Sequence, residues 1–316
     1  MSSMNFISAF LKDVLDFIFN LVGNYGWSVV IFTLLIRLVL MPLDIKSKQS
    51  MKRMSALQPQ IDALNKKYAK DKEKLNQKMS DLYRKEKINP LSGCLPMLIQ
   101  LPILFCMFTA MRVVANEHTV QMLLDLMNGT FNPDSFQSWL WIKNVYQPDS
   151  FFSTIIPAIA DPLSMISGVT GSSVLTAENL ESVRAFLATP EYAAIAAQYG
   201  ASSYVYTAPM LFWTISIPAQ FNGLFILPVL AGASQYLSSK LLSGQQTPAA
   251  NSSAASTNRM MQVFFPIFSV WICATSTAAF SIYWVAINII QIAQQYLMNV
   301  YFDRKEAKKP EEVAEP

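Results

Sequence analysis

The stretch Trp27–Leu43, WSVVIFTLLIRLVLMPL, is apolar for about the length of a membrane crossing and contains a single charged residue, Arg37. An arginine near the middle of a span costs about 2.5–3.5 kcal/mol to insert, so it needs water, an acidic partner or the membrane surface within reach. Snorkelling to the surface is the simpler alternative. Asp44 and Lys46 mark that surface at about 10 Å from Arg37, near the limit of the side chain. We therefore predict that Arg37 faces a polar groove inside the membrane.

The composition of the whole chain agrees with a membrane protein. Of its 316 residues 52% are hydrophobic and only 14% are charged, whereas a soluble domain has about 25% charged residues. The apolar region 260–300 is about twice as long as one crossing of a ~30 Å hydrocarbon core, so it must form two helices, with a turn near 274–279. We predict an all-α integral membrane protein with five transmembrane helices around a hydrophilic groove. The spans are expected at 24–43, 95–114 and 223–242, with two more in 260–300.

The distribution of charge predicts the orientation. Segment 44–94 has thirteen Lys or Arg residues against six acids, whereas segment 115–222 has only two, Lys143 and Arg184, against eight acids. Basic loops stay on the cytoplasmic side. We expect a multi-pass protein with its N-terminus outside and its C-terminus in the cytoplasm.

Two further segments are amphipathic. Residues 1–23 repeat apolar side chains at helical spacing and lack the features of a signal peptide, so we expect a helix that lies on the membrane surface. Segment 44–94 has two apolar stripes joined by a short polar link, which predicts a basic cytoplasmic helical hairpin. Pro59 should bend or break its first helix.

The segment 115–222 is expected outside the membrane. It contains a helical-looking piece, 178–199, and two short apolar patches with prolines, 151–165 and 208–218. We interpret the patches as interfacial or folded external structure, although the charge rule also permits seven spans. Residues 243–259 are predicted to form a cytoplasmic loop and residues 301–316 a charged cytoplasmic tail.

Polar side chains occur at helical spacing within the predicted spans. Trp284, Asn288, Gln291 and Gln295 are four, three and four residues apart, which places them along one face of the last span. A single amide in a span is more commonly an interhelical hydrogen bond than a site. No carboxylate inside the spans obviously pairs with Arg37, so we expect water or a ligand as its partner, and attraction of an acidic passenger segment. The residues expected to line one hydrated groove are Thr33, Arg37, Gln100, Gln235, Trp284, Asn288 and Gln291.

Several classes of function lack their residues. Cys94, Cys106 and Cys273 form no CxxC pair, and His118 is the only histidine. The sequence has no phosphate-binding glycine loop, GxSxG or HExxH motif. We expect no catalytic centre, no metal and no cofactor.

The basic hairpin is explained by the orientation rule alone, but ribosomal RNA, anionic lipid heads and nascent chains are all open as partners. Its few aromatic residues argue against sequence-specific binding of nucleic acid. Contacts with a nascent chain or ribosome are expected at Lys46, Lys48, Lys52, Arg53, Lys66, Lys67, Arg84 and Lys85.

A series of short motifs, in order along about 200 residues, resembles the YidC/Oxa/Alb membrane protein insertase family. Each motif is weak alone, and together they are specific. They are Arg37 with Met41-Pro42-Leu43, Leu57-Gln58-Pro59, Lys67-Tyr68, Leu82-Tyr83, Asn89-Pro90-Leu91, Gly93-Cys94-Leu95-Pro96, Gln100 with Pro102-Ile103, the Trp139–Ile142 patch, Ile226-Leu227-Pro228, and Tyr283-Trp284 with Asn288.

The resemblance implies five core helices around a groove that is open to cytoplasm and lipid and closed outside. Arg37 would receive the hydrophilic segment of a substrate, and substrate helices would pass between the third and fifth spans. The hairpin would guide nascent membrane proteins, and the ribosome and the Sec translocon are further expected partners of a monomer in the bacterial plasma membrane. The lack of a large outer domain before the first span resembles the Gram-positive form. The extra length between Asp149 and Gly223 departs from the family.

Two rival functions use the same features. A small-solute or ion transporter would also have a polar cavity, but we find no inverted repeat and no matched pair of broken helices. A structural assembly factor for other membrane complexes is the third alternative. Insertion of a short single-span substrate, measured beside solute flux, separates the three.

Overall fold

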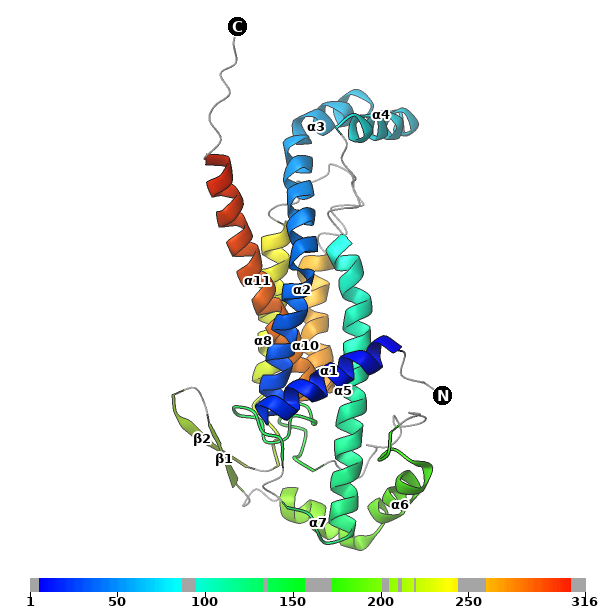
Figure 1. Ribbon diagram of the computed structural model, residues 1–316, viewed down its shortest axis with the longest axis vertical. Coiled ribbons are helices and arrows are strands. Elements are labelled where there is room, and N and C mark those ends of the chain that lie inside the picture. The colour runs from blue at the N-terminus through cyan, green and yellow to red at the C-terminus, as the bar shows by residue number, and fades with distance from the viewer. Residues whose placement is uncertain are drawn as a thin grey trace. The chain divides into compact units, whose positions relative to one another are not determined.

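The computed structural model describes residues 6–86, 95–132, 136–156, 172–200, 205–209, 212–218, 220–243 and 260–307. The described chain is mostly helical, with one small antiparallel sheet (Figure 1). Two of its helices, Tyr25–Ala56 and Ile99–Met127, are long and apolar enough to cross a membrane by length and composition. A shorter apolar helical segment covers Gln262–Thr275.

The chain divides into two compact units. Unit 1 comprises Met1–Thr33, Leu101–Gly232 and Ile267–Ala286, and unit 2 comprises Leu34–Gln100, Ala233–Pro266 and Ile287–Pro316. Five helices contribute residues to both units: α2 (Tyr25–Ala56), α5 (Leu95–Met127), α8 (Ile226–Ser243), α10 (Phe265–Thr275) and α11 (Ala278–Ala307).

The core of unit 1 forms around α5 and the start of α11. The ring of Phe108 on α5 packs edge-on against Phe280 on α11, with centroids 5.0 Å apart. Tyr146, in the loop after α5, stacks on His118 at 4.2 Å and contacts Tyr25 of α2 at 5.2 Å. Further side chains that are almost completely buried in this unit are Val29, Met107, Ala110, Val120, Leu123, Ile142, Val145 and Ile155.

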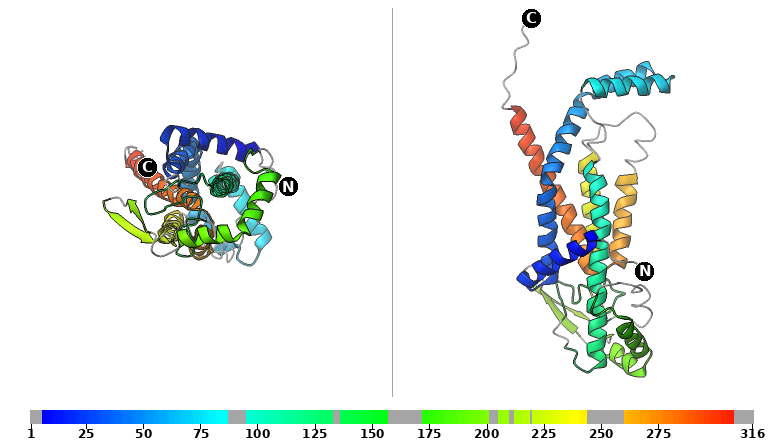
Figure 2. Two further views of the ribbon diagram at one scale, coloured as in Figure 1. Left: turned by 90° about the horizontal axis from the view of Figure 1, so that it is seen from below. Right: turned by 45° about the vertical axis from the view of Figure 1, so that its right-hand side comes forward.

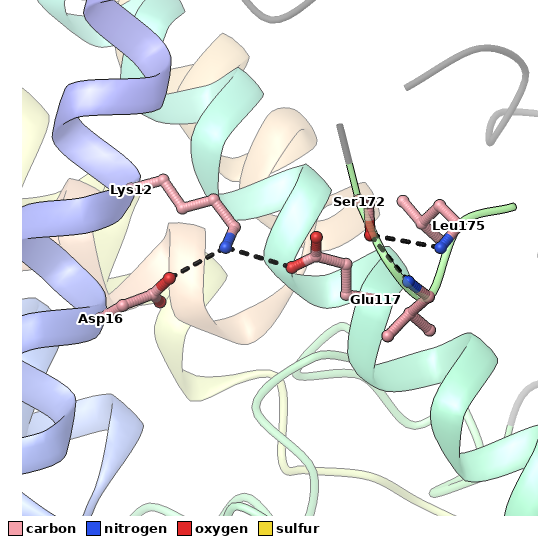
Figure 3. Close-up of polar contacts among 6 residues, drawn as sticks. Lys12, Asp16, Glu117, Ser172 and Leu175 are labelled. Carbon is pink, nitrogen blue, oxygen red and sulfur yellow. Dashed lines mark hydrogen bonds and ion pairs between the residues drawn. The ribbon is translucent and has the colours of Figure 1, made fainter. Parts of the chain in front are cut away.

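Helix α1 (Phe6–Val22) is joined to α5 by an ion-pair cluster (Figure 3). Lys12 Nζ lies 2.9 Å from Asp16 Oδ2 on its own helix and 3.3 Å from Glu117 Oε2 on α5. Burial by itself lowers the pKa of Lys12, but the two carboxylates outweigh this effect and raise it above 10.5. α1 buries Leu11, Leu15 and Ile18 and leaves another apolar face exposed. The exposed apolar residues are Phe6, Ile7, Phe10, Phe17, Leu21 and Val22.

Two buried polar side chains organise the loop that follows α5. Asp149 accepts hydrogen bonds from Trp141 Nε1 at 3.1 Å and from the backbone N–H groups of Phe225 and Leu227 at 3.0 and 2.7 Å. It thereby satisfies amides at the start of α8. Burial raises the pKa of the Asp149 carboxyl above 3.8, although these hydrogen bonds oppose the shift. Asn222 donates to the carbonyls of Asn144 and Pro148 and accepts from the Asn144 N–H.

The long segment between Asp149 and Gly223 contains two helices and a hairpin. α6 (Ala177–Leu187) begins at the cap Thr176, which accepts from the Asn179 N–H at 3.1 Å, and α7 (Pro190–Gly200) follows it. β1 (Val205–Pro209) pairs antiparallel with β2 (Thr214–Pro218). The apolar patch 208–218 is therefore part of a hairpin of short strands and not a span. The end of the other patch, 157–165, lies outside the described residues.

Unit 2 contains the second halves of α2, α8 and α11, together with α3 (Gln58–Lys67), α4 (Lys72–Lys85) and a π-helical turn, η3 (Met260–Phe264). α3 and α4 contact each other and bury Leu57, Ile61 and Leu75. The ends of α2 and α11 are tied together, since Lys52 Nζ lies 3.1 Å from Asp303 Oδ1.

Helix bounds differ from the sequence predictions at several points. α2 continues through Pro42 to Ala56, so it joins the first expected span to residues that we assigned to the hairpin. The helix ends before Leu57, and Pro59 lies in the first turn of α3. N–H groups in the first turn have no partner within the helix, so the missing N–H of proline removes no helical hydrogen bond there. α5 extends to Met127, well beyond the expected end at 114. The loop 244–259 and the tail after 307 lie outside the described residues.

Candidate intramembrane polar site

Arg37 lies on the buried face of α2, with 6% of its surface exposed. Its Nη2 donates to Gln291 Oε1 of α11 at 3.0 Å. The opposite face of α2 exposes Leu35 and Val39. This helix therefore has one polar, buried side and one apolar, exposed side within the same two turns, as a lipid-facing helix beside a polar site would.

Asp44 completes the cluster around Arg37. Its Oδ2 lies 3.7 Å from Arg37 Nη1 and accepts a hydrogen bond from Gln294 Nε2 at 2.9 Å. We expected water or a ligand as the partner of Arg37, but in the structure its partners include Gln291 and Asp44, the first residue after the predicted span. Residues seven apart lie on the same side of a helix after two turns. The spacing of Arg37 and Asp44 in the sequence is therefore the feature that predicts their pairing.

A second pair of polar contacts involves α8. Asn288 Nδ2 of α11 donates to Ser234 Oγ of α8 at 3.3 Å, and Gln235 Nε2 donates to Ser239 Oγ on its own helix at 3.4 Å. Asn288 is buried, whereas Gln235 is half-buried. The stripe on α11 thus contacts α2 through Gln291 and α8 through Asn288.

The other expected groove residues are placed differently. Thr33 is buried, and its hydroxyl donates to Val29 O of its own helix at 2.7 Å. Trp284 is buried and packs on Phe280 with ring centroids 5.6 Å apart. Both belong to unit 1, whereas Arg37, Asn288 and Gln291 belong to unit 2. Gln100 is half-buried on α5.

Most of the basic residues expected to meet a nascent chain or ribosome are exposed. The exposed ones are Lys46, Arg53, Lys66, Lys67, Arg84 and Lys85. Lys48 is buried, with 4% of its surface exposed, and Lys52 is half-buried in its ion pair with Asp303. The geometry thus leaves six of the eight basic side chains accessible to a partner. The described residues contain no group of three His, Cys, Asp or Glu side chains that could hold a metal ion.

These features define a class, that of helical membrane proteins with a buried polar site and a basic helical pair. The chain matches the family model described as the 60Kd inner membrane protein over residues 17–306. It belongs to that family, the YidC/Oxa/Alb family of insertases, so the family predicted from the motifs is confirmed.

Two named relatives agree with this assignment, and one solved structure is also similar to the chain. A membrane protein insertase YidC of Fusobacterium nucleatum is 40% identical over 167 residues, which is 52% of this chain and 72% of the relative. That of Caldanaerobacter subterraneus is 29% identical over 291 residues, 92% of this chain and 93% of the relative. A crystal structure of an active YidC insertase with its first transmembrane domain resolved gives a TM-score of 0.45 at 20% identity, covering 92% of this chain and 47% of that one.

Proposed function

We propose that this chain is a membrane protein insertase that receives the polar segment of its substrate at the cluster of Arg37, Asp44 and Gln291. The family consists of insertases and not of enzymes, and it acts in membranes. The observation that carries the proposed mechanism is the burial of Arg37, which has 6% of its surface exposed and donates to a side chain of another helix.

The proposed cycle is electrostatic. A short acidic or polar substrate segment replaces Gln291 or Asp44 as the partner of the guanidinium. The guanidinium then offsets part of the free energy that the segment loses when it leaves water for the apolar phase. The apolar helix of the substrate then partitions into lipid. Membrane potential adds about 2.3 kcal/mol per charge per 100 mV. Asn288 and Ser234, which link α11 to α8 at 3.3 Å, support a polar path along α11.

We propose that α2, α5, α8, α10 and α11 are the five spans, with α1 on the outer surface and α3 and α4 in the cytoplasm. The lengths of α2, α5 and α11, which have 32, 33 and 30 residues, support this arrangement. At 1.5 Å per residue each is about 45–50 Å long, so each crosses a ~30 Å core and extends beyond it. The exposed apolar side chains of α8, α10 and α11, such as Val229, Ile267 and Ile289, support contact with lipid.

The exposed basic residues of α2, α3 and α4 are proposed to meet nascent chains on the ribosome and anionic lipid heads. Replacing Lys66, Lys67, Arg84 and Lys85 with glutamine should weaken co-sedimentation with ribosome–nascent chain complexes. Arg184→Gln, which removes an exposed basic side chain from α6, is the control. Equal co-sedimentation of all variants would count against this role.

The experiment that tests the mechanism is insertion of a short single-span substrate into proteoliposomes. Arg37→Ala should slow substrates with an acidic outer tail by about tenfold and leave neutral-tailed substrates much less affected. Arg37→Lys should retain more activity if charge, and not the guanidinium fork, is needed. Solute flux should be absent throughout. The mechanism fails if Arg37→Ala slows both classes of substrate equally or neither of them.

A further inference from the structure

The hairpin formed by β1 and β2 has one exposed face and ends in a turn with two aromatic residues. The register pairs Val205 with Pro218 and Thr207 with Ser216, so polar and aliphatic side chains alternate on the exposed face. On the other face of β2, Ile217 is buried with 1% of its surface exposed, which fixes the base of the hairpin to unit 1. The exposed side chains among the described strand residues are Val205, Thr207, Thr214 and Ser216, and none of them is aromatic or charged.

The turn between the strands presents two large aromatic side chains. Phe212 is 88% exposed and Trp213 is 62% exposed. Figures 1 and 2 show that the hairpin projects from unit 1 away from α6 and α7. A two-stranded hairpin is only marginally stable in water. Two adjacent aromatic side chains exposed at its turn indicate contact with an apolar or interfacial surface, because their exposure to water is unfavourable.

The charge of this part of the chain indicates what that surface is. Residues 192–239 contain no Asp, Glu, Lys, Arg or His, whereas α6, in the same external segment, exposes Glu178, Glu181 and Arg184. Protein interfaces usually have a polar, partly charged rim. An uncharged segment with Phe212 and Trp213 in the turn of its hairpin has instead the composition of a membrane interface.

The position of the hairpin in the chain agrees with this surface. β2 ends at Pro218 and α8, a proposed span, begins at Ile226. The seven connecting residues reach at most about 25 Å when extended. The base of the hairpin is therefore tied close to the point where α8 enters the membrane.

We propose that Phe212 and Trp213 insert into the outer leaflet of the lipid bilayer and anchor the external segment beside α8. This inference rests on the proposed orientation of the chain, with 115–222 outside. It assigns a lipid-binding role to the segment between Asp149 and Gly223, where this chain has more residues than the family pattern leads us to expect.

The test uses the full chain in phosphatidylcholine–phosphatidylglycerol vesicles with bromine on the acyl chains. The emission of Trp213 is obtained as the difference between the unchanged protein and Trp213→Phe. It should be quenched strongly by the brominated lipid and hardly by aqueous iodide. The matched control carries Trp213→Phe together with Ala185→Trp, at an exposed position of α6, and the signal from residue 185 should show the opposite behaviour.

Two results would overturn the proposal. Quenching of Trp213 by iodide and not by brominated lipid would place the turn in water. Shielding of Trp213 from both quenchers would mean that protein, such as a second copy of the chain, covers it. Neither result bears on the role of Arg37, because the insertion assay with Arg37→Ala is read separately in the same vesicles.

Discussion

Asp44 lies two helical turns after Arg37 on α2, and its Oδ2 is 3.7 Å from Arg37 Nη1. Gln294 Nε2 of α11 donates a hydrogen bond to the same oxygen at 2.9 Å. A buried guanidinium without a counter-charge is costly, so Asp44 stabilises Arg37 in the absence of substrate. In the mechanism that we propose, an acidic substrate segment competes with this internal carboxylate for the same cation, and the competition limits how tightly the site binds the segment.

This competition predicts the effect of Asp44→Asn. The amide removes the internal negative charge and keeps the shape of the side chain, so the site should bind acidic segments more tightly. In photo-crosslinking of nascent substrates to the groove, we expect the yield for an acidic-tailed substrate to rise several-fold, with no rise for a neutral-tailed one. Asp303→Asn is the matched control, since it removes an acid from the exposed ion pair with Lys52. A uniform change for both substrates would contradict competition at Arg37.

A second prediction concerns Gly223, which lies against Asp149. A Cβ at position 223 would be 2.0 Å from Asp149 Oδ1 and 3.2 Å from Asp149 Cα. Gly223→Ala should therefore displace the carboxylate from the start of α8 and destabilise the fold by about 2–3 kcal/mol, seen as a lower melting temperature in detergent. In an Asp149→Ala background the same change should cost much less, because the clashing carboxylate is gone. Additive effects of the two substitutions would exclude this steric coupling.

The sequence predicted the parts of the site that depend on helical periodicity. Arg37 and Gln291 were both predicted to line the groove, and Arg37 Nη2 lies 3.0 Å from Gln291 Oε1, because the spacing on α2 and α11 already determines which face each residue occupies. Asp44 was treated only as a marker of the membrane surface, since the span was expected to end at Leu43. The continuation of α2 through Pro42 keeps Asp44 in helical register with Arg37, and this continuation was not predicted.

Features built from distant contacts could not be predicted in the same way. Asp149 and Leu227 are 78 positions apart, as are Asn144 and Asn222, and no periodicity links them. The patch 208–218 was predicted to be external and apolar, but its short run with prolines did not distinguish strand from helix. Its hairpin depends on cross-strand pairing, such as Tyr206 with Ile217, which only the folded chain defines.

A third prediction concerns the attachment of α1 to α5. Glu117→Gln removes one of the two carboxylates that contact Lys12 and leaves Asp16, at 2.9 Å, on the same helix as the lysine. The remaining pair holds the lysine but no longer joins two helices. Because Lys12 and Glu117 are both mostly buried, with side-chain exposures of 18% and 21%, the loss should be on the order of 1 kcal/mol.

This loss should appear as local opening of α1 and not as global unfolding. About 1 kcal/mol corresponds to roughly fivefold faster amide hydrogen exchange in α1, with exchange in α11 unchanged. Glu181→Gln, on the exposed surface of α6, is the control and should leave α1 unaffected. If exchange in α1 stays the same in Glu117→Gln, its attachment depends on the buried Leu11, Leu15 and Ile18 alone. The link through Lys12 would then contribute nothing measurable to the position of the helix.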